Sequence, residues 1–370
     1  MLLSSISIIN FKNIKSENLN FSHKINCLIG NNGEGKTNVL DAIFYLSFCH
    51  SAFNSKDSDL ITHGKDFFVL EGKYINNYNN NPSEDYIYCG LKRGQKKHFK
   101  RNKKEYKKLS QHIGLIPLIF ISPADISVIN GGSEERRKLM DIVISQYKHE
   151  YLDTLLKYNK ALQNRNKLLK QEETIDETLI ELLEMQMAEY GDAIFKARLN
   201  YIEKLTPIFQ TIYSKITNEH ENITIDYVSH GQNGDLLKTI QESRAKDLIM
   251  GYSLHGIHKD DIIIKLNGYP LKKEGSQGQI KSMVIALKLA QFLFLKQATK
   301  QKAPLLLLDD LFDKLDALRV ENLVKLVAGN DFGQIFITDT NKDHLTDIFK
   351  NHNLDYKIFT VDNGTIKQNK

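Results

Sequence analysis

The sequence predicts an α/β fold in which mixed β-sheets carry flanking helices and an α-helical arm domain is inserted. Three observations predict it. A glycine-rich segment, residues 30–37, lies between an apolar run and a segment with helical periodicity. A second apolar run, residues 304–308, is followed directly by two aspartates. Between these segments, residues 133–207 carry apolar side chains at helical rather than strand spacing.

The glycine-rich segment fits the pattern G-x-x-x-x-G-K-[ST], the phosphate-binding loop of nucleoside triphosphatases. Glycines let backbone N–H groups turn inward on the phosphates, and the following helix N-terminus adds a favourable dipole. Lys36 is expected to reach the β and γ phosphates of ATP, and the hydroxyl of Thr37 to bind Mg²⁺. The alternative is a glycine-rich turn that carries Lys-Thr by chance. The residues expected to bind the nucleotide here are Gly30, Asn31, Asn32, Gly33, Glu34, Gly35, Lys36 and Thr37.

Composition narrows the class of protein. The chain has 370 residues, 41% of them hydrophobic and 26% charged, which is typical of a soluble globular protein with one large or two moderate domains. No run approaches the roughly 20 apolar residues of a membrane span, and no signal peptide is recognisable, so a cytoplasmic protein without membrane contact is expected. The three cysteines lack metal-ligand spacing. A net charge of +5 implies that any nucleic-acid surface is local.

The apolar run before Asp309 resembles a Walker B strand, whose aspartate holds Mg²⁺, commonly through water. Lys36 precedes Asp309 by 273 positions, far more than a compact phosphate-loop core needs, so a substantial insertion is expected. The predicted domains are an ATPase head at 1–132 and 251–370, in which 66–122 form a β-rich part, and a mainly helical arm at 133–250.

Within the β-rich part, residues 67–74 and 86–90 read as strands, 76–83 as a polar turn, and 115–122 as a further strand. In the arm, Ser133 with two following glutamates is a plausible helix start. Two antiparallel helices are expected to meet at 171–176, and β structure to resume near Ile223. Their predicted apolar stripes are Leu152, Leu155, Leu162 and Leu169, then Leu179, Leu183, Met187, Tyr190, Ile194 and Ala197.

The sequence Ser-x-Gly-Gln opens an apolar helix 33 positions before Asp309 and matches the signature motif of ABC-type ATPases. A serine hydroxyl and a bare helix N-terminus form a second anion site. In the ABC architecture this site contacts the γ-phosphate held by a partner subunit, so that ATP joins a homodimer. The alternative is an ordinary N-cap serine. The residues concerned are Ser276, Gln277, Gly278 and Gln279.

Asp310 stands where ABC-type ATPases commonly carry a glutamate that positions or deprotonates the attacking water. Together with Lys36 it is the expected catalytic residue, and its shorter reach predicts slow hydrolysis. Asp316, in the D-loop position, is expected to face the other subunit. The strand at 334–340 lacks the usual switch histidine at its end, so the γ-phosphate sensor is expected among Asp339, Thr340 and Asn341, with His344 an ordinary surface residue.

Together these motifs resemble those of the RecF family, whose members are bacterial recombination-mediator ATPases of the ABC/SMC class. The likeness runs nearly end to end, with departures at Lys12, Ile257, Lys259 and Lys314. The segments that carry it are 9–14, 30–46, 122–125, 131–141, 158–169, 256–261, 276–279 and 307–316.

The resemblance implies an ABC-type head with a short helical arm, an ATP-dependent homodimer that binds single-stranded and gapped DNA, and weak DNA-stimulated ATPase activity. It also implies action with the RecO and RecR proteins to load a recombinase at single-strand gaps, in support of replication and the SOS response.

Ten basic residues and one acid, Glu105, fall between positions 92 and 108, with Phe99 and Tyr106 interleaved. The run predicts either a sequence-independent phosphate track or a solvated hairpin whose lysines protect an edge strand. His258 and Lys259 are expected at an inter-subunit surface. The DNA-binding candidates are Lys96, Lys97, Lys100, Arg101, Lys103, Lys104, Arg136 and Arg137.

The sequence argues against three other functions of a phosphate-loop protein. The missing switch histidine, the arm and the basic run argue against a transporter subunit. A chromosome-organising SMC protein needs hundreds of heptad residues. A defence ATPase with a nuclease needs a carboxylate cluster with two-metal spacing, and Asp260-Asp261 is the one further acid pair that suggests it.

Overall fold

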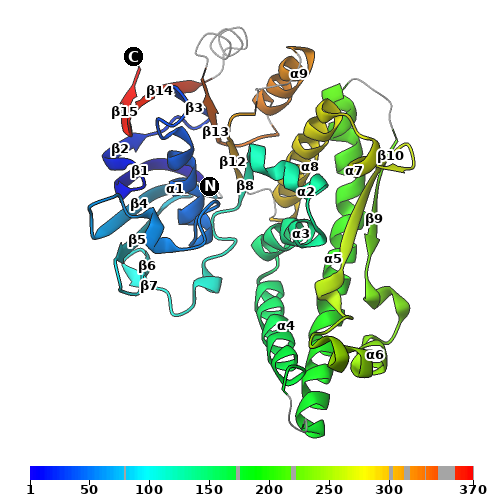
Figure 1. The fold of residues 1–370 in the computed structure, drawn as a ribbon. Coiled ribbons are helices and arrows are strands. Elements are labelled where there is room, and N and C mark those ends of the chain that lie inside the picture. Colours follow the sequence, from blue (N-terminus) through cyan, green and yellow to red (C-terminus); the bar gives the residue numbers. More distant parts are fainter. Residues whose placement is uncertain are drawn as a thin grey trace. The chain divides into compact units, whose positions relative to one another are not determined.

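The computed structural model describes residues 1–78, 81–171, 176–217, 222–299, 303–311, 317–329, 331–340 and 355–369 (Figure 1). Contacts divide the chain into two compact units. We call the first the head unit; it comprises Met1–Asp125, Lys215–Thr217 and Ile285–Lys370. The second, the arm unit, comprises Ile126–Ser214 and Asn218–Val284.

A central sheet with strand order β15-β14-β3-β13-β12-β8 organises the head unit. All its neighbouring pairs are parallel except β14–β15. Strands β3, β12, β13 and β8 are buried along their whole length, which explains their predominantly apolar sequences. Their bounds are β3 Ile25–Ile29, β8 Leu118–Ile121, β12 Leu305–Leu308, β13 Ile335–Asp339, β14 Tyr356–Asp362 and β15 Thr365–Gln368.

The head unit also contains an antiparallel sheet with order β2-β1-β4-β5-β6-β7. One face packs on helix α1 (Lys36–Phe48) in a shared apolar core, where the rings of Phe11 and Phe68 meet edge to face at 5.4 Å. The other face carries polar side chains such as Ser5, Ser7, Glu71 and Lys73 together with exposed aromatic ones such as Phe67. The strands are β1 Leu2–Phe11, β2 Ile14–Asn20, β4 Phe67–Tyr78, β5 Asn81–Lys92, β6 His98–Arg101 and β7 Lys104–Glu105.

Two details of the predicted β-rich part are corrected. The polar turn expected at 76–83 is largely strand, because β4 and β5 stay paired as far as Asn76 opposite Ser83 and beyond. The strand within 115–122 is β8, and it joins the central sheet, where Leu118 pairs with Leu305. Its uniformly apolar sequence suits a strand buried on both faces better than an edge of the antiparallel sheet.

Helices α8 (Gln277–Ala298) and α9 (Ala317–Ala328) complete the head unit, which takes α8 only from Ile285 onward. By length and composition α8 could span a membrane, so the expectation that no segment comes near that length is corrected. About two thirds of its most apolar window, 67%, is buried inside the protein, as in the core helix of a globular domain.

The arm unit consists of helices and a small antiparallel sheet in the order β11-β10-β9. Helices α4 and α5 are antiparallel, because Arg165 contacts Glu184 whereas Tyr151, earlier in α4, contacts Arg198, later in α5. The bounds are α2 Ser127–Asn130, α3 Ser133–Tyr147, α4 His149–Leu168, α5 Glu177–Thr217, α6 Leu236–Met250, α7 Leu271–Glu274, β9 Ile223–Val228, β10 Asp261–Leu266 and β11 Tyr269–Pro270.

The predicted helix start at Ser133 and the return of β structure at Ile223 are confirmed. The compact units differ from the predicted domains at 251–284, which belong to the arm unit because β10 pairs with β9 along its length. Leu169, at the C-cap of α4, is buried as predicted, whereas Leu152, Leu155 and Leu162 are half-buried. The buried stripe within α4 is therefore a different one. It contains Tyr151, Tyr158, Ala161 and the guanidinium of Arg165, a polar group that periodicity alone does not place in a core.

Candidate nucleotide-binding site

The loop between β3 and α1 has the geometry of a phosphate-binding loop. Gly33 and Gly35 adopt positive φ angles of 86° and 113°, a region that favours glycine. A Cβ atom on Gly30 would lie 2.3 Å from the carbonyl oxygen of Val361 in β14, so this position tolerates no side chain. The spacing that predicted the loop therefore reflects both backbone conformation and close packing.

Lys36 lies at the start of α1 and folds back across the loop. Its Nζ donates to the carbonyl oxygens of Gly30 and Asn31, at 2.7 and 2.8 Å. Burial lowers the pKa of Lys36, and the nearby carboxylates of Asp310 and Asp309 oppose that effect. An ammonium held among carbonyls and carboxylates at the N-terminus of a helix is suited to an anionic phosphate chain.

Thr37, Asp309 and Thr338 form a group of oxygen donors at the ends of β12 and β13. The Oγ1 of Thr37 donates to the carboxylate of Asp309 at 2.8 and 3.0 Å, and the Oγ1 of Thr338 donates to the same carboxylate at 2.8 Å. Burial raises the pKa of Asp309, and the hydroxyl donors oppose that rise. A carboxylate beside a hydroxyl is the hard oxygen set that Mg²⁺ prefers, so these residues fit the predicted metal.

Asp310 directly follows this group. Its backbone adopts a left-handed conformation with φ 47°, and its N–H donates to the Oγ1 of Thr338 at 2.9 Å. One threonine therefore positions both predicted acidic residues. Asp339 ends β13, and its carbonyl accepts from the N–H of Gly30 at 3.3 Å. The D-loop with Asp316, and the candidates Asn341 and His344, lie outside the described residues.

Residues that motif reasoning did not assign support the loop from outside. Asn13, in the turn between β1 and β2, donates to the carbonyl of Glu34 at 2.9 Å and accepts from Asn38 at 2.8 Å. The turn Asn363-Gly364 contacts Glu34 as well, and the N–H of Gly364 donates to the Glu34 carbonyl at 2.8 Å. Two features of the sequence indicate these residues. Asn13 lies in the family-like segment 9–14, and Asn-Gly marks a tight hairpin.

Ser276 precedes α8 and forms a reciprocal cap with Gln279. The N–H of Gln279 donates to Oγ of Ser276 at 3.2 Å, and Oε1 of Gln279 accepts from the N–H of Ser276 at 3.0 Å. This capping box confirms the N-cap geometry. The serine is exposed and uses its oxygen as acceptor in this cap. Its cross-subunit role stays a prediction.

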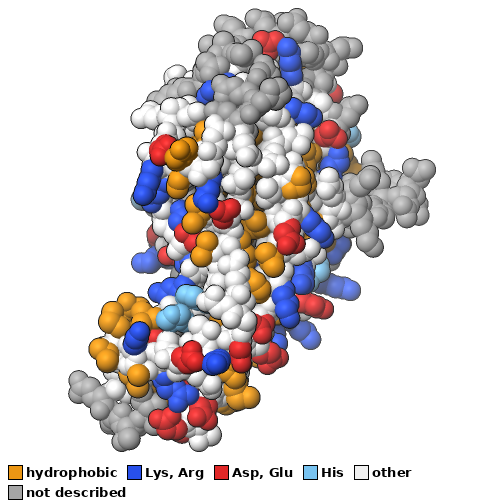
Figure 2. Space-filling view, turned by 90° about the vertical axis from the view of Figure 1, so that its right-hand side faces the viewer, with side chains coloured by type: hydrophobic (Ala, Val, Ile, Leu, Met, Phe, Trp, Pro, Cys, Tyr) orange, Lys and Arg blue, Asp and Glu red, His pale blue; other side chains and the backbone are white. Residues whose placement is uncertain are grey.

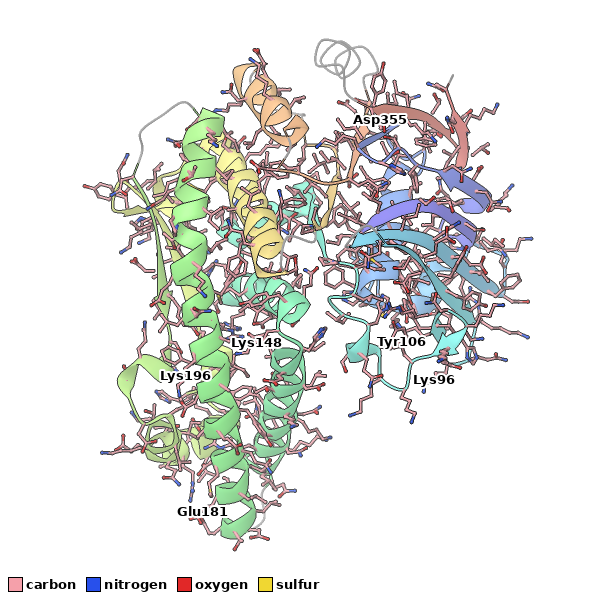
Figure 3. All side chains as sticks on the ribbon, turned by 180° about the vertical axis from the view of Figure 1, so that it is seen from behind. Lys96, Tyr106, Lys148, Glu181, Lys196 and Asp355 are labelled. Atoms are coloured by element: carbon pink, nitrogen blue, oxygen red, sulfur yellow. The ribbon has the colours of Figure 1, made fainter. Side chains whose placement is uncertain are left out.

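The DNA-binding candidates divide into two groups. Lys96, which lies in the loop leading into β6 (Figure 3), is exposed, as are Lys103 and Lys104, and Lys100 is half-buried. The other four make internal contacts: Lys97 with Asp57 at 2.8 Å, Arg101 with Asp85 at 2.8 Å, Arg136 with Asp261 at 2.6 Å, and Arg137 with the carbonyl of Asp260 at 2.7 Å. These contacts assign Lys97, Arg101, Arg136 and Arg137 to the folded framework.

The acid pair and histidine of segment 256–261 also serve the arm unit internally. Asp260 accepts from Arg198 at 2.7 Å and from the hydroxyl of Tyr227 at 2.6 Å. Nδ1 of His258 lies 2.8 Å from the hydroxyl of Tyr158. His258 is therefore not the free surface group that an inter-subunit role requires. Among the described residues no group of three or more His, Cys, Asp and Glu side chains is arranged to hold a metal.

Comparison with known proteins agrees with this geometry. A family model described as the RecF/RecN/SMC N terminal domain matches residues 2–367. The DNA replication and repair protein RecF of Phocaeicola vulgatus is 56% identical over 370 residues, which cover 100% of this chain and 99% of that protein. The chain belongs to the RecF family. The RecF protein of Bacteroides fragilis is 55% identical over 368 residues, covering 100% and 98% of the two chains.

Solved structures give the same assignment. A recombination mediator protein RecF of the RecFOR pathway, solved with ATP, matches with a TM-score of 0.88 and 32% identity, covering 100% of this chain and 98% of that one. An Smc head bound to the C-winged helix domain of ScpA matches with a TM-score of 0.59 and 16% identity, covering 100% and 98%, and supports the fold alone. The chain thus has the ABC-type ATPase fold that RecF and SMC heads share.

Proposed function

We propose that this RecF-family chain is a cytoplasmic ATP-dependent DNA-binding protein of recombinational gap repair, in which ATP acts mainly as a dimerisation switch. The observation that carries the proposal is the convergence of Lys36, Thr37 and Asp309 at one loop. This is the arrangement that cradles a nucleoside triphosphate and its Mg²⁺. When bound, Mg²⁺ would neutralise phosphate charge, and Thr37 and Asp309 would hold it.

Dimerisation follows from the second predicted anion site. Ser276 is exposed at the N-terminus of a 22-residue helix, α8. We infer that this end meets the γ-phosphate bound by a second copy of the chain. Nucleotide occupancy is then coupled to dimer closure, since ATP would bind the closed dimer better than the monomer.

Slow turnover suits such a switch. Asp310 would orient or deprotonate water, and its side chain is one methylene shorter than glutamate. We propose weak, DNA-stimulated ATPase activity, with binding rather than hydrolysis producing the closed state. Single-stranded and gapped DNA are the proposed ligands, and RecO and RecR the proposed partners in loading a recombinase, as the name of the RecFOR pathway suggests for the solved relative.

The test measures the mass of the protein in solution with ATP, ADP or no nucleotide, each with and without gapped duplex DNA. We expect dimers that ATP favours and that Lys36→Ala and Ser276→Arg abolish. Ser276→Thr is the matched control, because threonine keeps both the cap and the hydroxyl. Normal ATP-driven dimers of Ser276→Arg would show that the cross-subunit assignment is wrong.

A further inference from the structure

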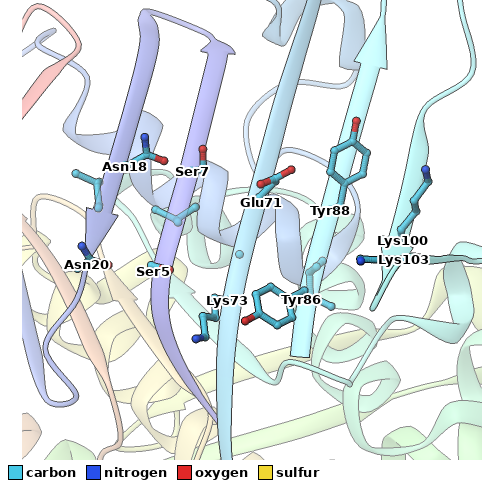
Figure 4. A pocket seen from close by; sticks show the side chains of 14 residues that line it. Ser5, Ser7, Asn18, Asn20, Glu71, Lys73, Tyr86, Tyr88, Lys100 and Lys103 are labelled. Atoms are coloured by element: carbon cyan, nitrogen blue, oxygen red, sulfur yellow. The ribbon is translucent and has the colours of Figure 1, made fainter. Parts of the chain in front are cut away.

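The antiparallel sheet of the head unit has an exposed face with a trough of about 540 Å³. Two rows of side chains line it, and cross-strand register sets both rows. The first row runs across β2, β1, β4, β5 and β6; the second runs across β2, β1, β4 and β5 to the turn after β6. In order, the first comprises Asn18, Ser7, Glu71, Tyr88 and Lys100, and the second Asn20, Ser5, Lys73, Tyr86 and Lys103 (Figure 4).

The middle of the trough is hollow because its central positions carry small side chains. Ser5 and Ser7 occupy alternate positions of β1, while Ile6 and Ile8 between and beside them point into the core. A sheet face that another element covered would carry apolar residues there. Hydroxyl and amide groups instead leave this face rich in hydrogen-bond donors and acceptors.

Two tyrosines form one side of the trough. Tyr86 and Tyr88 are two residues apart on β5, so their rings lie on the same face, and Tyr86 is 51% exposed. Each ring already faces an ammonium: Nζ of Lys73 lies 5.6 Å from the centre of the Tyr86 ring, and Nζ of Lys100 lies 5.4 Å from that of Tyr88. A ligand that stacks on either ring would bring its own charge beside a lysine.

Charge favours an anionic ligand. The lining contains three lysines and one acid, Glu71. Lys73 is paired with Glu84 at 2.7 Å, which leaves Lys100 and Lys103 to face an anion. The turn between β6 and the edge strand β7 carries Lys103, and β7 begins at Lys104; both lysines are exposed. On the face drawn in Figure 2, by contrast, acidic and basic side chains are interspersed.

We propose that this trough is a binding site for single-stranded DNA. Bases stack on Tyr86 and Tyr88, the phosphates follow Lys100 and Lys103, and the polar floor meets base edges. Antiparallel sheets with exposed aromatic residues bind unpaired bases in this way, with little sequence preference because every base has a π-face. Duplex DNA does not fit the same site, since its bases are already stacked on one another. This inference rests on the proposed function and adds the location of the strand.

The chain contains no tryptophan, so Tyr86→Trp introduces a single tryptophan reporter into the trough. We expect oligo(dT) to quench its fluorescence in a saturable manner, because a stacked base quenches an indole. The double variant Tyr86→Ala/Tyr88→Ala is expected to bind oligo(dT) at least tenfold more weakly, whereas Tyr88→Phe, which keeps the ring, retains most of the affinity.

The lysines and the acid are expected to act in opposite directions. Lys100→Gln/Lys103→Gln should weaken binding and reduce the slope of log affinity against log salt by about 1.4, from about 0.7 for each lost phosphate contact. Glu71→Gln should strengthen binding. Lys15→Gln, exposed on β2 and outside the lining, is the matched basic control. These side chains are solvent-facing, so the folded sheet should tolerate their exchange.

The outcomes separate the inference from the proposed function. If the wild-type protein forms ATP-driven dimers and binds gapped DNA, but the tyrosine double variant binds oligo(dT) as tightly as wild type, the trough is not the site. An unquenched tryptophan in a Tyr86→Trp protein that binds oligo(dT) would likewise contradict the inference. Trough variants that lose binding to a protein partner but keep their DNA affinity would contradict it as well. If wild type binds no DNA in any nucleotide state, the proposed function itself fails.

Discussion

Thr37 and Asp309 are 272 positions apart, yet the Oγ1 of Thr37 lies 2.8 Å from one carboxylate oxygen of Asp309. The contact joins the loop after β3 to the end of β12, two strands that only β13 separates in the central sheet. Thr338 at the end of β13 holds the same carboxylate. Three neighbouring strand ends thus form one oxygen-rich site, although an entire arm unit intervenes in the chain.

The first prediction concerns this site. Thr37→Val and Asp309→Ala each remove an expected Mg²⁺ ligand, so Mg²⁺-dependent ATP binding should weaken at least about tenfold. Calorimetric titration of ATP with and without Mg²⁺ measures it. Thr338→Val removes a hydroxyl that contacts Asp309 and Asp310 but is not an expected Mg²⁺ ligand, so it should weaken ATP binding less. Equal ATP affinity of Asp309→Ala and wild type in Mg²⁺ would refute the metal assignment.

A second prediction separates binding from turnover. Asp310→Asn keeps the shape of the side chain and, because asparagine tolerates the left-handed conformation observed here, should fold normally. Loss of the carboxylate should slow ATP hydrolysis at least about a hundredfold, the low end of what a positioned base contributes. Phosphate release and ATP affinity are measured on the same sample. Unchanged hydrolysis would remove Asp310 from the catalytic site.

A third prediction tests the support beneath α1. Asp41 is fully buried, pairs with Nζ of Lys12 at 2.6 Å, and accepts from the hydroxyl of Ser51 and the N–H of Ala52. Lys12→Met leaves a buried carboxylate without its cation and should lower the free energy of unfolding by about 3–5 kcal/mol. Urea denaturation measures the change. The exposed Lys15→Met is the control, and equal destabilisation of the two variants would disprove the role of the pair.

The fourth prediction concerns the arm unit. Arg165 is fully buried and bonds Glu184 at 2.8 Å and Asp247 at 2.7 Å, both also fully buried. Arg165→Met should lower the thermal midpoint strongly, because two buried carboxylates lose a shared partner. Arg244→Met, which removes a more exposed partner of Glu184, should lower the thermal midpoint less. A smaller midpoint change for Arg165→Met than for Arg244→Met would contradict this reading.

A fifth prediction follows from His258. Burial lowers its pKa from 6.5 to about 4, and its Nδ1 accepts from the hydroxyl of Tyr158 while Nε2 donates to the carbonyl of Ser253. Unfolded His258 binds a proton more tightly than folded His258. The contribution of neutral His258 to the free energy of unfolding is therefore complete above pH 6.5 and is lost as the pH falls toward 4.

Protonation of His258 changes the free energy of unfolding by at most about 1.4 kcal/mol per pH unit. Urea unfolding at several pH values measures it, and His258→Gln should show a shallower loss than wild type. His112→Gln serves as a parallel variant, because burial also lowers the pKa of His112 to about 4. An identical pH dependence in His258→Gln and wild type would exclude His258 as a source.

Local sequence determined the elements that carry nucleotide chemistry. The glycine spacing at 30–37, the apolar run at 304–308 and the cap at Ser276 each depend on a few adjacent residues, whose conformations and burial the pattern itself constrains. These elements are present where they were predicted. The end-to-end family resemblance is likewise a property of the sequence, and the comparisons confirm it.

Tertiary structure decided what each charged side chain does. Lys97 and Lys96 are neighbours in one basic run, yet Lys97 is bound to Asp57 whereas Lys96 is exposed. Each of the two rows of the trough is assembled from five segments, and β10 joins the arm because β9 offers it a paired edge. Such pairings depend on strand register and on contacts between distant segments, which a local pattern does not contain.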